Sequence, residues 1–112
     1  MNPEELINEA GPVKSIETDS EQVIVKLKGD IDLTSSPEVR VAMREILSSK
    51  PKTVILDLEE VGYMDSSGVA TLVEALQQIK KYDGQLTLKK LQPRVRSVFE
   101  IARLTEIFDI SE

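Results

Sequence analysis

The chain has 112 residues, 40% of them hydrophobic and 30% charged, which predicts one globular domain with a single buried core. It contains neither cysteine nor histidine, and this excludes disulfides, thiolate and imidazole metal sites, the Ser-His-Asp triad and the Cys-His pair. The net charge of -6 argues against nucleic acid as a partner, because nucleic-acid affinity depends on cationic side chains that meet phosphates.

The chain begins with a predicted tail and a predicted hairpin. Residues 1–12 contain two prolines and a glycine around a short acidic segment, which predicts a tail or a loosely attached turn, and the domain itself is expected over residues 13–112. Apolar and polar residues nearly alternate over 13–18 and over 22–28. The polar Asp19-Ser20-Glu21 between these segments suits a tight connection, so they predict an antiparallel hairpin.

A helix is predicted after the hairpin, because apolar residues recur at spacings of three and four up to about Ser48. Its start allows two registers. Either Ser36 is the N-cap with Pro37 at the first helical position, or Ser35 is the N-cap and Glu38 completes a capping box. The sequence leaves both registers open.

The second half of the chain alternates strands and helices. A nearly continuous apolar run over 54–58 predicts a central strand buried on both faces. An amphipathic helix follows and stops at Asp83-Gly84, a strand is expected over 85–89, a helix begins at Pro93, and 107–110 is expected to add a short strand. This order predicts an α/β fold with a mixed sheet of four to five strands and about four helices.

Charge is distributed unevenly along the chain. Residues 80–103 are rich in lysine and arginine and residues 1–38 are acidic on balance, an asymmetry that is typical of solvated faces and that can also orient a charged partner. No apolar stretch approaches the roughly 20 residues that span a bilayer, and residues 1–5 lack the positive charge and apolar segment of a signal peptide. We therefore expect a cytoplasmic protein with no membrane partner.

The turn Asp65-Ser66-Ser67-Gly68 lies between the central strand and the next helix, and it is the candidate functional site. One interpretation is structural, because serines at a helix start usually cap it. The other is that Ser66 accepts a phosphate, since a helix N-terminus is exposed and its N–H groups and dipole tolerate an anion. The fold would then be unaffected, and the consequence would appear at a partner surface.

Catalysis, metals and cofactors are not expected. A Ser-Lys mechanism at Ser66 or Ser67 is the remaining nucleophilic chemistry, but the lysines fall in polar stretches. No phosphate-cradling glycine motif is present, so no nucleotide cofactor is predicted. Four aspartates match no calcium loop and no glycosidase arrangement: Asp30, Asp32, Asp57 and Asp65. We interpret these four as capping and loop residues.

The segments around the serine turn resemble the anti-sigma factor antagonists of the STAS domain family. The family's central strand, turn and helix are similar to Val54-Ile55-Leu56-Asp57-Leu58, Val61 and Tyr63-Met64-Asp65-Ser66-Ser67-Gly68-Val69. Its turn after the second strand is similar to Gly29-Asp30-Ile31-Asp32, and its later strand and helix to Gly84-Gln85-Leu86 and to Pro93, Val95, Val98 and Phe99. The resemblance covers residues 13–112 and implies the STAS fold.

The resemblance also implies a partner switch controlled at Ser66. A cognate GHKL-type serine kinase, which is also an anti-sigma factor, would phosphorylate Ser66 with its own ATP. The unphosphorylated chain would bind this kinase and release a sigma factor or another client, and a PPM-type phosphatase would act on the phosphorylated form. Partner contacts are expected from Asp30, Asp32, Thr34, Asp65, Ser66, Ser67 and Gly68. The alternative within the family is a subunit of a stressosome-like complex or of a lipid ABC transporter.

Overall fold

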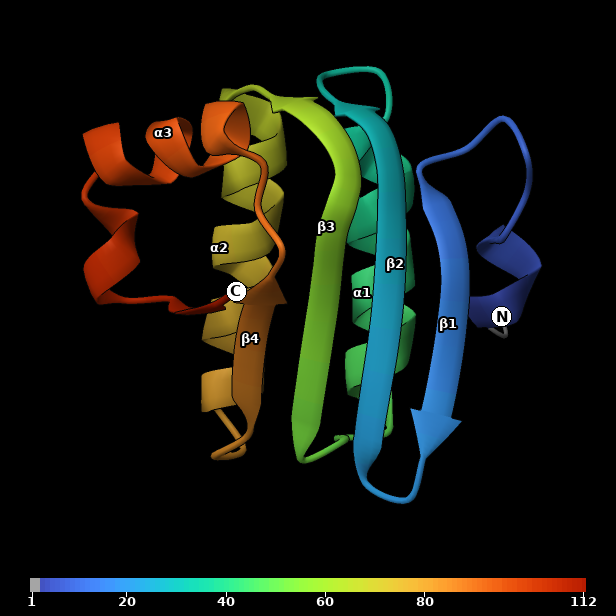
Figure 1. Cartoon of the computed structure of the whole chain (residues 1–112). Coiled ribbons are helices and arrows are strands. Elements are labelled where there is room, and N and C mark those ends of the chain that lie inside the picture. Colours follow the sequence, from blue (N-terminus) through green and yellow to red (C-terminus); the bar gives the residue numbers. More distant parts are fainter. Residues whose placement is uncertain (1–2) are drawn as a thin grey trace.

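The computed structural model describes residues 3–112 and contains a mixed sheet of five strands. The strands follow chain order across the sheet, with β1 antiparallel to β2 and each later neighbouring pair parallel (Figure 1). They are β1 (Val13–Asp19), β2 (Gln22–Ile31), β3 (Thr53–Met64), β4 (Gln85–Lys89) and β5 (Asp109–Ser111). The predicted α/β fold with a leading hairpin is confirmed.

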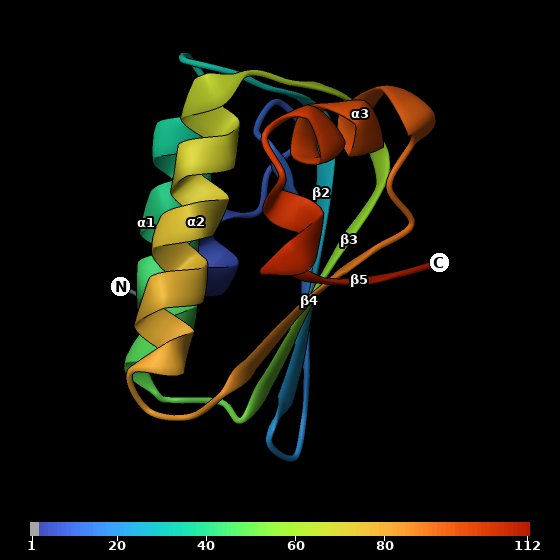
Figure 2. The same ribbon diagram turned by 90° about the vertical axis from the view of Figure 1, so that its left-hand side faces the viewer.

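Three α-helices and two short 3-10 helices accompany the sheet in the part of the chain that the structure describes. They are η1 (Pro3–Leu6), α1 (Ser36–Ser48), α2 (Ser66–Lys80), α3 (Pro93–Ile101) and η2 (Leu104–Glu106). Figure 2 shows α1 and α2 side by side against one face of the sheet. Beyond the short strand β4, α3 lies beside the upper part of β3 and contacts it (Figure 1).

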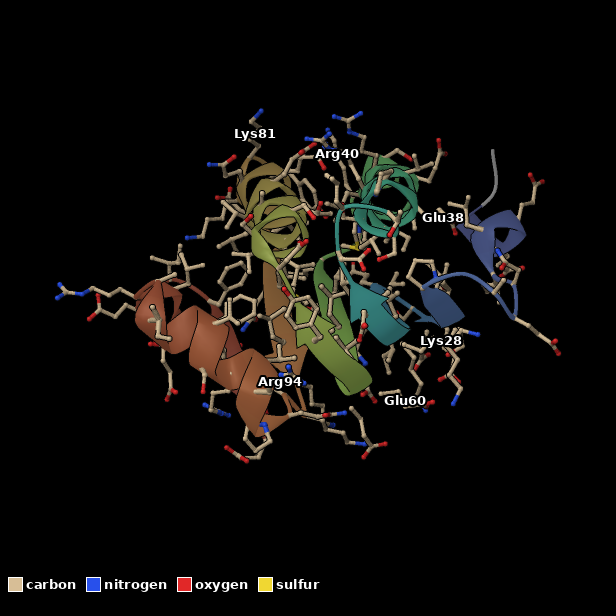
Figure 3. The ribbon with its side chains drawn as sticks, turned by 90° about the horizontal axis from the view of Figure 1, so that it is seen from above. Lys28, Glu38, Arg40, Glu60, Lys81 and Arg94 are labelled. Atoms are coloured by element: carbon tan, nitrogen blue, oxygen red, sulfur yellow. The ribbon has the colours of Figure 1, made fainter. Side chains whose placement is uncertain are left out.

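The core lies between the sheet and the pair α1 and α2, where the apolar stripes predicted for both helices are buried. Its largest fully buried side chains include Leu27, Leu56 and Leu58 from the strands and Met43, Leu72 and Ile79 from the helices. Arg40 and Arg44 of α1 both donate hydrogen bonds to the Glu74 carboxylate of α2 (Arg40 is labelled in Figure 3). The two helices are therefore joined by apolar packing and by a shared carboxylate.

The end of β2 differs from the sequence-based expectation. The second strand was expected over 22–28, but it continues to Ile31. Gly29 adopts a φ of 75°, a conformation that glycine tolerates and most residues avoid, and the pairing with β3 shifts register just after it. The chain thus passes through an irregularity at Gly29 without leaving the sheet.

The central strand is also longer than predicted, because a polar interruption in it is satisfied locally. The apolar run over 54–58 predicted a short strand, whereas β3 extends to Met64. Pairing with β2 shifts register here, and the buried Asp57 carboxylate accepts a hydrogen bond from the Glu59 backbone N–H at 3.0 Å. The Lys90 amine lies 3.8 Å from the same carboxylate. Asp57 therefore supports the irregular part of the strand.

The segment before β1 packs against the domain. Residues 1–2 of the predicted tail lie outside the described residues, and η1 follows them. Leu6 is partly buried against the core, and η1 contacts both α1 and β1. Lys28 donates from its backbone N–H to the Pro12 carbonyl at 2.9 Å and from its amine to the Glu9 carbonyl at 2.7 Å. Residues 3–12 are thus attached along the edge of the sheet.

Among residues 3–112, no helix combines the length and the apolar character that crossing a bilayer would require. The longest helix, α2, carries polar residues along the face that turns away from the sheet. Its buried residues lie on the opposite face, as in a helix that covers one side of a sheet.

Candidate functional site

The extended β2 and β3 bring two loops together at one edge of the sheet. Ile31 and Met64, the last residues of these parallel strands, are paired. Figure 1 accordingly shows the β2–α1 and β3–α2 connections at the same end of the molecule. The Asp65 backbone N–H donates to the Ile31 carbonyl at 3.2 Å, which ties the start of one loop to the other. The residues predicted for the site from two separate segments are therefore neighbours.

Asp65 organises the turn that precedes α2. It is the N-cap residue, and its carboxylate accepts hydrogen bonds from the Ser67 N–H at 2.9 Å and from the Gly68 N–H at 3.1 Å. The Ser67 hydroxyl donates to the same carboxylate. The hydrogen bond from the Ser67 hydroxyl is the largest cause that lowers the pKa of Asp65, with the backbone donors adding to it. An aspartate, and not a serine, thus caps α2.

The two serines of the turn have different environments. Ser67 is half-buried and its hydroxyl is engaged with Asp65. Ser66 is exposed at the first position of α2, and its hydroxyl forms no hydrogen bond with any residue of the described range 3–112. The Ser66 oxygen is therefore open to solvent and is not needed to cap the helix.

The loop between β2 and α1 is held by a second aspartate. The Asp32 carboxylate accepts hydrogen bonds from the Thr34 N–H at 3.0 Å, from the Ser35 N–H at 3.2 Å and from the Thr34 hydroxyl at 2.6 Å. The hydrogen bond from the Thr34 hydroxyl is the largest cause that lowers the pKa of Asp32. Asp30 precedes this loop as an exposed residue of β2. Both loops of the site thus use a carboxylate to satisfy backbone N–H groups.

The start of α1 matches neither predicted register in full. Ser35 occupies the N-cap position, but it forms no side-chain capping bond, and the expected capping box with Glu38 is absent from this part of the described chain. The Ser35 hydroxyl instead donates to the Asp30 carbonyl at 2.7 Å and accepts from the Asp32 N–H at 2.9 Å. The Ser36 N–H donates to the Asp32 carbonyl at 2.8 Å. Ser35 therefore stabilises the loop and not the helix end.

Gly68 lies beneath the predicted contact surface. It is buried, and a Cβ at this position would lie 2.6 Å from the Ile31 carbonyl oxygen and 2.6 Å from Cγ of Met64. No side chain other than hydrogen fits this space without a shift of the backbone. Gly68 thus lets α2 begin directly against the end of β2, and it supports the predicted contact surface from inside the protein.

Two exposed side chains at this edge were missing from the predicted set. Leu33 is 77% exposed, at the tip of the loop between Asp32 and Thr34. Tyr63 is 40% exposed, and the Arg94 guanidinium lies 5.6 Å from its ring centroid. Figure 3, which views this edge from above, labels Arg94 on α3 beside the end of β3. For Leu33, the signal in the sequence was a large apolar residue inside a polar loop, next to the predicted contact residues Asp32 and Thr34.

Comparisons with known proteins agree with this geometry. The STAS domain family model matches residues 13–112. The anti-sigma-B factor antagonist of Listeria monocytogenes is 34% identical over 95 residues, which are 84% of this chain and 82% of the relative. That of Bacillus subtilis is 34% identical over 99 residues, covering 88% of this chain and 87% of the relative.

Solved structures show the same fold at lower identity. A putative anti-sigma factor antagonist from Thermotoga maritima has a TM-score of 0.82 at 19% identity, covering 88% of this chain and 85% of that one. The unphosphorylated anti-sigma factor antagonist SpoIIAA has a TM-score of 0.67 at 20% identity, covering 88% and 86%. Since the family model spans the sheet, the helices and both loops of the site, this chain belongs to the STAS domain family, and its resemblance to the anti-sigma factor antagonists is confirmed.

Proposed function

We propose that this chain is an anti-sigma factor antagonist whose binding is switched by phosphorylation of Ser66. In the unphosphorylated form it binds a GHKL-type serine kinase that is also an anti-sigma factor, and the bound kinase releases a sigma factor or another client. The observation that carries the proposal is the exposed Ser66 oxygen, which has no hydrogen-bond partner within residues 3–112. A kinase can reach this oxygen without unfolding the turn. The relatives named above, which are anti-sigma-B factor antagonists, support the same assignment.

The contact surface of this proposal comprises the two loops and the start of α2. It includes Asp30, Asp32, Thr34, Asp65, Ser66 and Ser67, with Gly68 supporting them from inside. The chain acts as substrate and binding partner, and we propose no catalytic role for it. ATP belongs to the kinase, and a PPM-type phosphatase restores the unphosphorylated form.

A phosphate on Ser66 would change this surface without changing the fold. It adds about 1.5 to 2 negative charges at neutral pH. The N–H groups of Ser67 and Gly68 already donate to Asp65, so the phosphate would project outward beside that carboxylate. A docked partner would then have to bury a doubly charged group next to a second anion. A thousandfold loss of affinity needs only about 4 kcal/mol, which such burial can supply.

Incubation with a cognate GHKL-type kinase and ATP tests the proposal. We expect one phosphate per chain, located at Ser66 by mass spectrometry. Ser66→Ala should accept none, while Ser97→Ala, which removes an exposed serine of α3, should be phosphorylated like the parent. Ser66→Asp should bind the kinase much more weakly than the parent. Stoichiometric phosphate on Ser66→Ala, or parent-like binding by Ser66→Asp, would refute the proposal.

A further inference from the structure

Leu33 is an apolar side chain in an unusual position. It is 77% exposed, although large aliphatic residues elsewhere in the described chain are mostly buried in the core. A single exposed leucine needs no explanation by itself. Leu33, however, lies two residues after Ile31, whose carbonyl accepts a hydrogen bond from the N–H of Asp65, the residue directly before Ser66. It therefore adjoins the surface on which the proposed switch acts.

The loop holds Leu33 in a fixed backbone conformation. Three backbone N–H groups of the loop, those of residues 32, 34 and 35, donate to side-chain oxygens. The Asp32 N–H donates to the Ser35 hydroxyl at 2.9 Å. The N–H groups of Thr34 and Ser35 donate to the Asp32 carboxylate at 3.0 Å and 3.2 Å. Ordering this loop therefore costs little when a partner docks, which is the condition under which an exposed apolar side chain contributes most affinity.

We infer that Leu33 is the apolar anchor of the kinase-binding surface and inserts into an apolar pocket on the kinase. This inference rests on the proposed function and adds the residue that supplies its affinity. Interfaces of this kind depend on a few central side chains, surrounded by polar groups that exclude water. Here the polar surroundings are Asp32, Thr34 and the Ser66 turn. A phosphate on Ser66 would bring water and charge to the rim of the same pocket. Phosphorylation of Ser66 would therefore weaken the contact that Leu33 makes with the kinase.

Binding measurements on four variants test the anchor. We would measure Kd for the cognate GHKL-type kinase in the presence of ADP, which permits docking without phosphate transfer. Leu33→Ala and Leu33→Asn should each weaken binding about tenfold or more, because one removes the apolar volume and the other its apolar character. Leu33→Met should stay within about threefold of the parent, since it keeps an apolar side chain of similar size. Ile101→Ala, which truncates an 84% exposed isoleucine on α3, is the matched control and should bind like the parent.

The outcomes separate this inference from the proposed function. Melting temperatures of the Leu33 variants should match the parent, because the side chain is mostly exposed, and this excludes unfolding as the cause of weaker binding. If Leu33→Ala and Leu33→Asn bind within about threefold of the parent while Ser66→Asp blocks binding, the anchor is wrong and the switch stands. If the parent itself is neither bound nor phosphorylated at Ser66, both fail. If these substitutions dissociate a dimer of the chain and leave kinase binding intact, Leu33 contacts a second copy and the anchor is overturned.

Discussion

Replacing Gly68 with alanine tests the close approach of α2 to the end of β2. The added Cβ would lie 2.6 Å from the Ile31 carbonyl oxygen and 2.6 Å from Cγ of Met64, both well inside van der Waals contact. Met64 is a flexible side chain, but the Ile31 oxygen belongs to the backbone of β2. It also accepts the Asp65 N–H at 3.2 Å, so moving it away weakens the bond that joins the two loops. Relief of this strain therefore requires a shift of the β2 backbone and not only a movement of the Met64 side chain.

The expected loss of stability follows from two opposing terms. Overpacking of a well-packed site typically costs about 1 to 3 kcal/mol. Alanine gains at most about 1 kcal/mol over glycine through its higher helix propensity. Because one clashing atom is a backbone oxygen, we expect an overpacking cost at the upper end of that range, and Gly68→Ala should lower the free energy of unfolding by about 2 kcal/mol. Urea unfolding followed by far-UV circular dichroism should show a lower midpoint with an unchanged m value.

Gly62→Ala provides the matched control for this substitution. A Cβ on Gly62 would meet only the Gln92 side-chain oxygen, at 4.0 Å, which is ordinary contact. This variant should unfold at the parent's midpoint or slightly above it, because a strand residue gains from a side chain. If Gly68→Ala lies within about 0.5 kcal/mol of the parent, the close approach of α2 to the Ile31 carbonyl does not hold the two loops together.

Two further substitutions test interactions away from the site. Glu74→Gln removes the carboxylate shared by Arg40 and Arg44, whose hydrogen bonds, Arg40 first, lower the pKa of Glu74. A carboxyl group whose pKa is lowered by folding stabilises the fold at pH values above its pKa in the unfolded chain. The difference in urea midpoint between the parent and Glu74→Gln should therefore shrink as the pH falls from roughly 5 to 3. A difference that stays constant over this range would contradict the assignment. Tyr82→Phe removes the hydroxyl that donates to the Pro51 carbonyl at 2.8 Å, and it should cost about 1 kcal/mol at neutral pH. Burial raises the pKa of Tyr82, so the parent should lose stability above roughly pH 10 faster than Tyr82→Phe, as thermal unfolding against pH would measure.

Apolar periodicity predicted the elements well where packing is regular. The strand expected over 85–89 and the helix end expected near Ser48 agree with the structure, because in both segments one face is buried and the other is polar. The extensions of β2 and β3 were missed for the opposite reason. Glu59 and Gly29 interrupt the apolar pattern, yet the backbone pairing continues past both of them. Such pairing depends on the neighbouring strand, which a pattern along one strand does not reveal.

The candidate site was predictable where it is local in sequence. Asp65 and Ser66 form a strand-to-helix turn whose capping chemistry is visible in four consecutive residues. The position of Leu33 was not predictable, because Asp65 lies far along the chain and meets the end of β2 only through the pairing of β2 with β3. The registers expected for α1 failed similarly. The Ser35 oxygen accepts from the Asp32 N–H and its hydroxyl donates to the Asp30 carbonyl, so it accepts no N–H of the first helical turn.

The two aspartates of the site explain why a phosphate would alter binding more than folding. Asp32 and Asp65 have lowered pKa values because each accepts several hydrogen bonds, so both stay ionised well below neutral pH. Both are also committed to the backbone N–H groups of their loops, and neither can turn away from a new anion without releasing those donors. A phosphate on Ser66 therefore has one low-cost direction, toward solvent. In the proposed switch, that direction is the one from which the kinase docks.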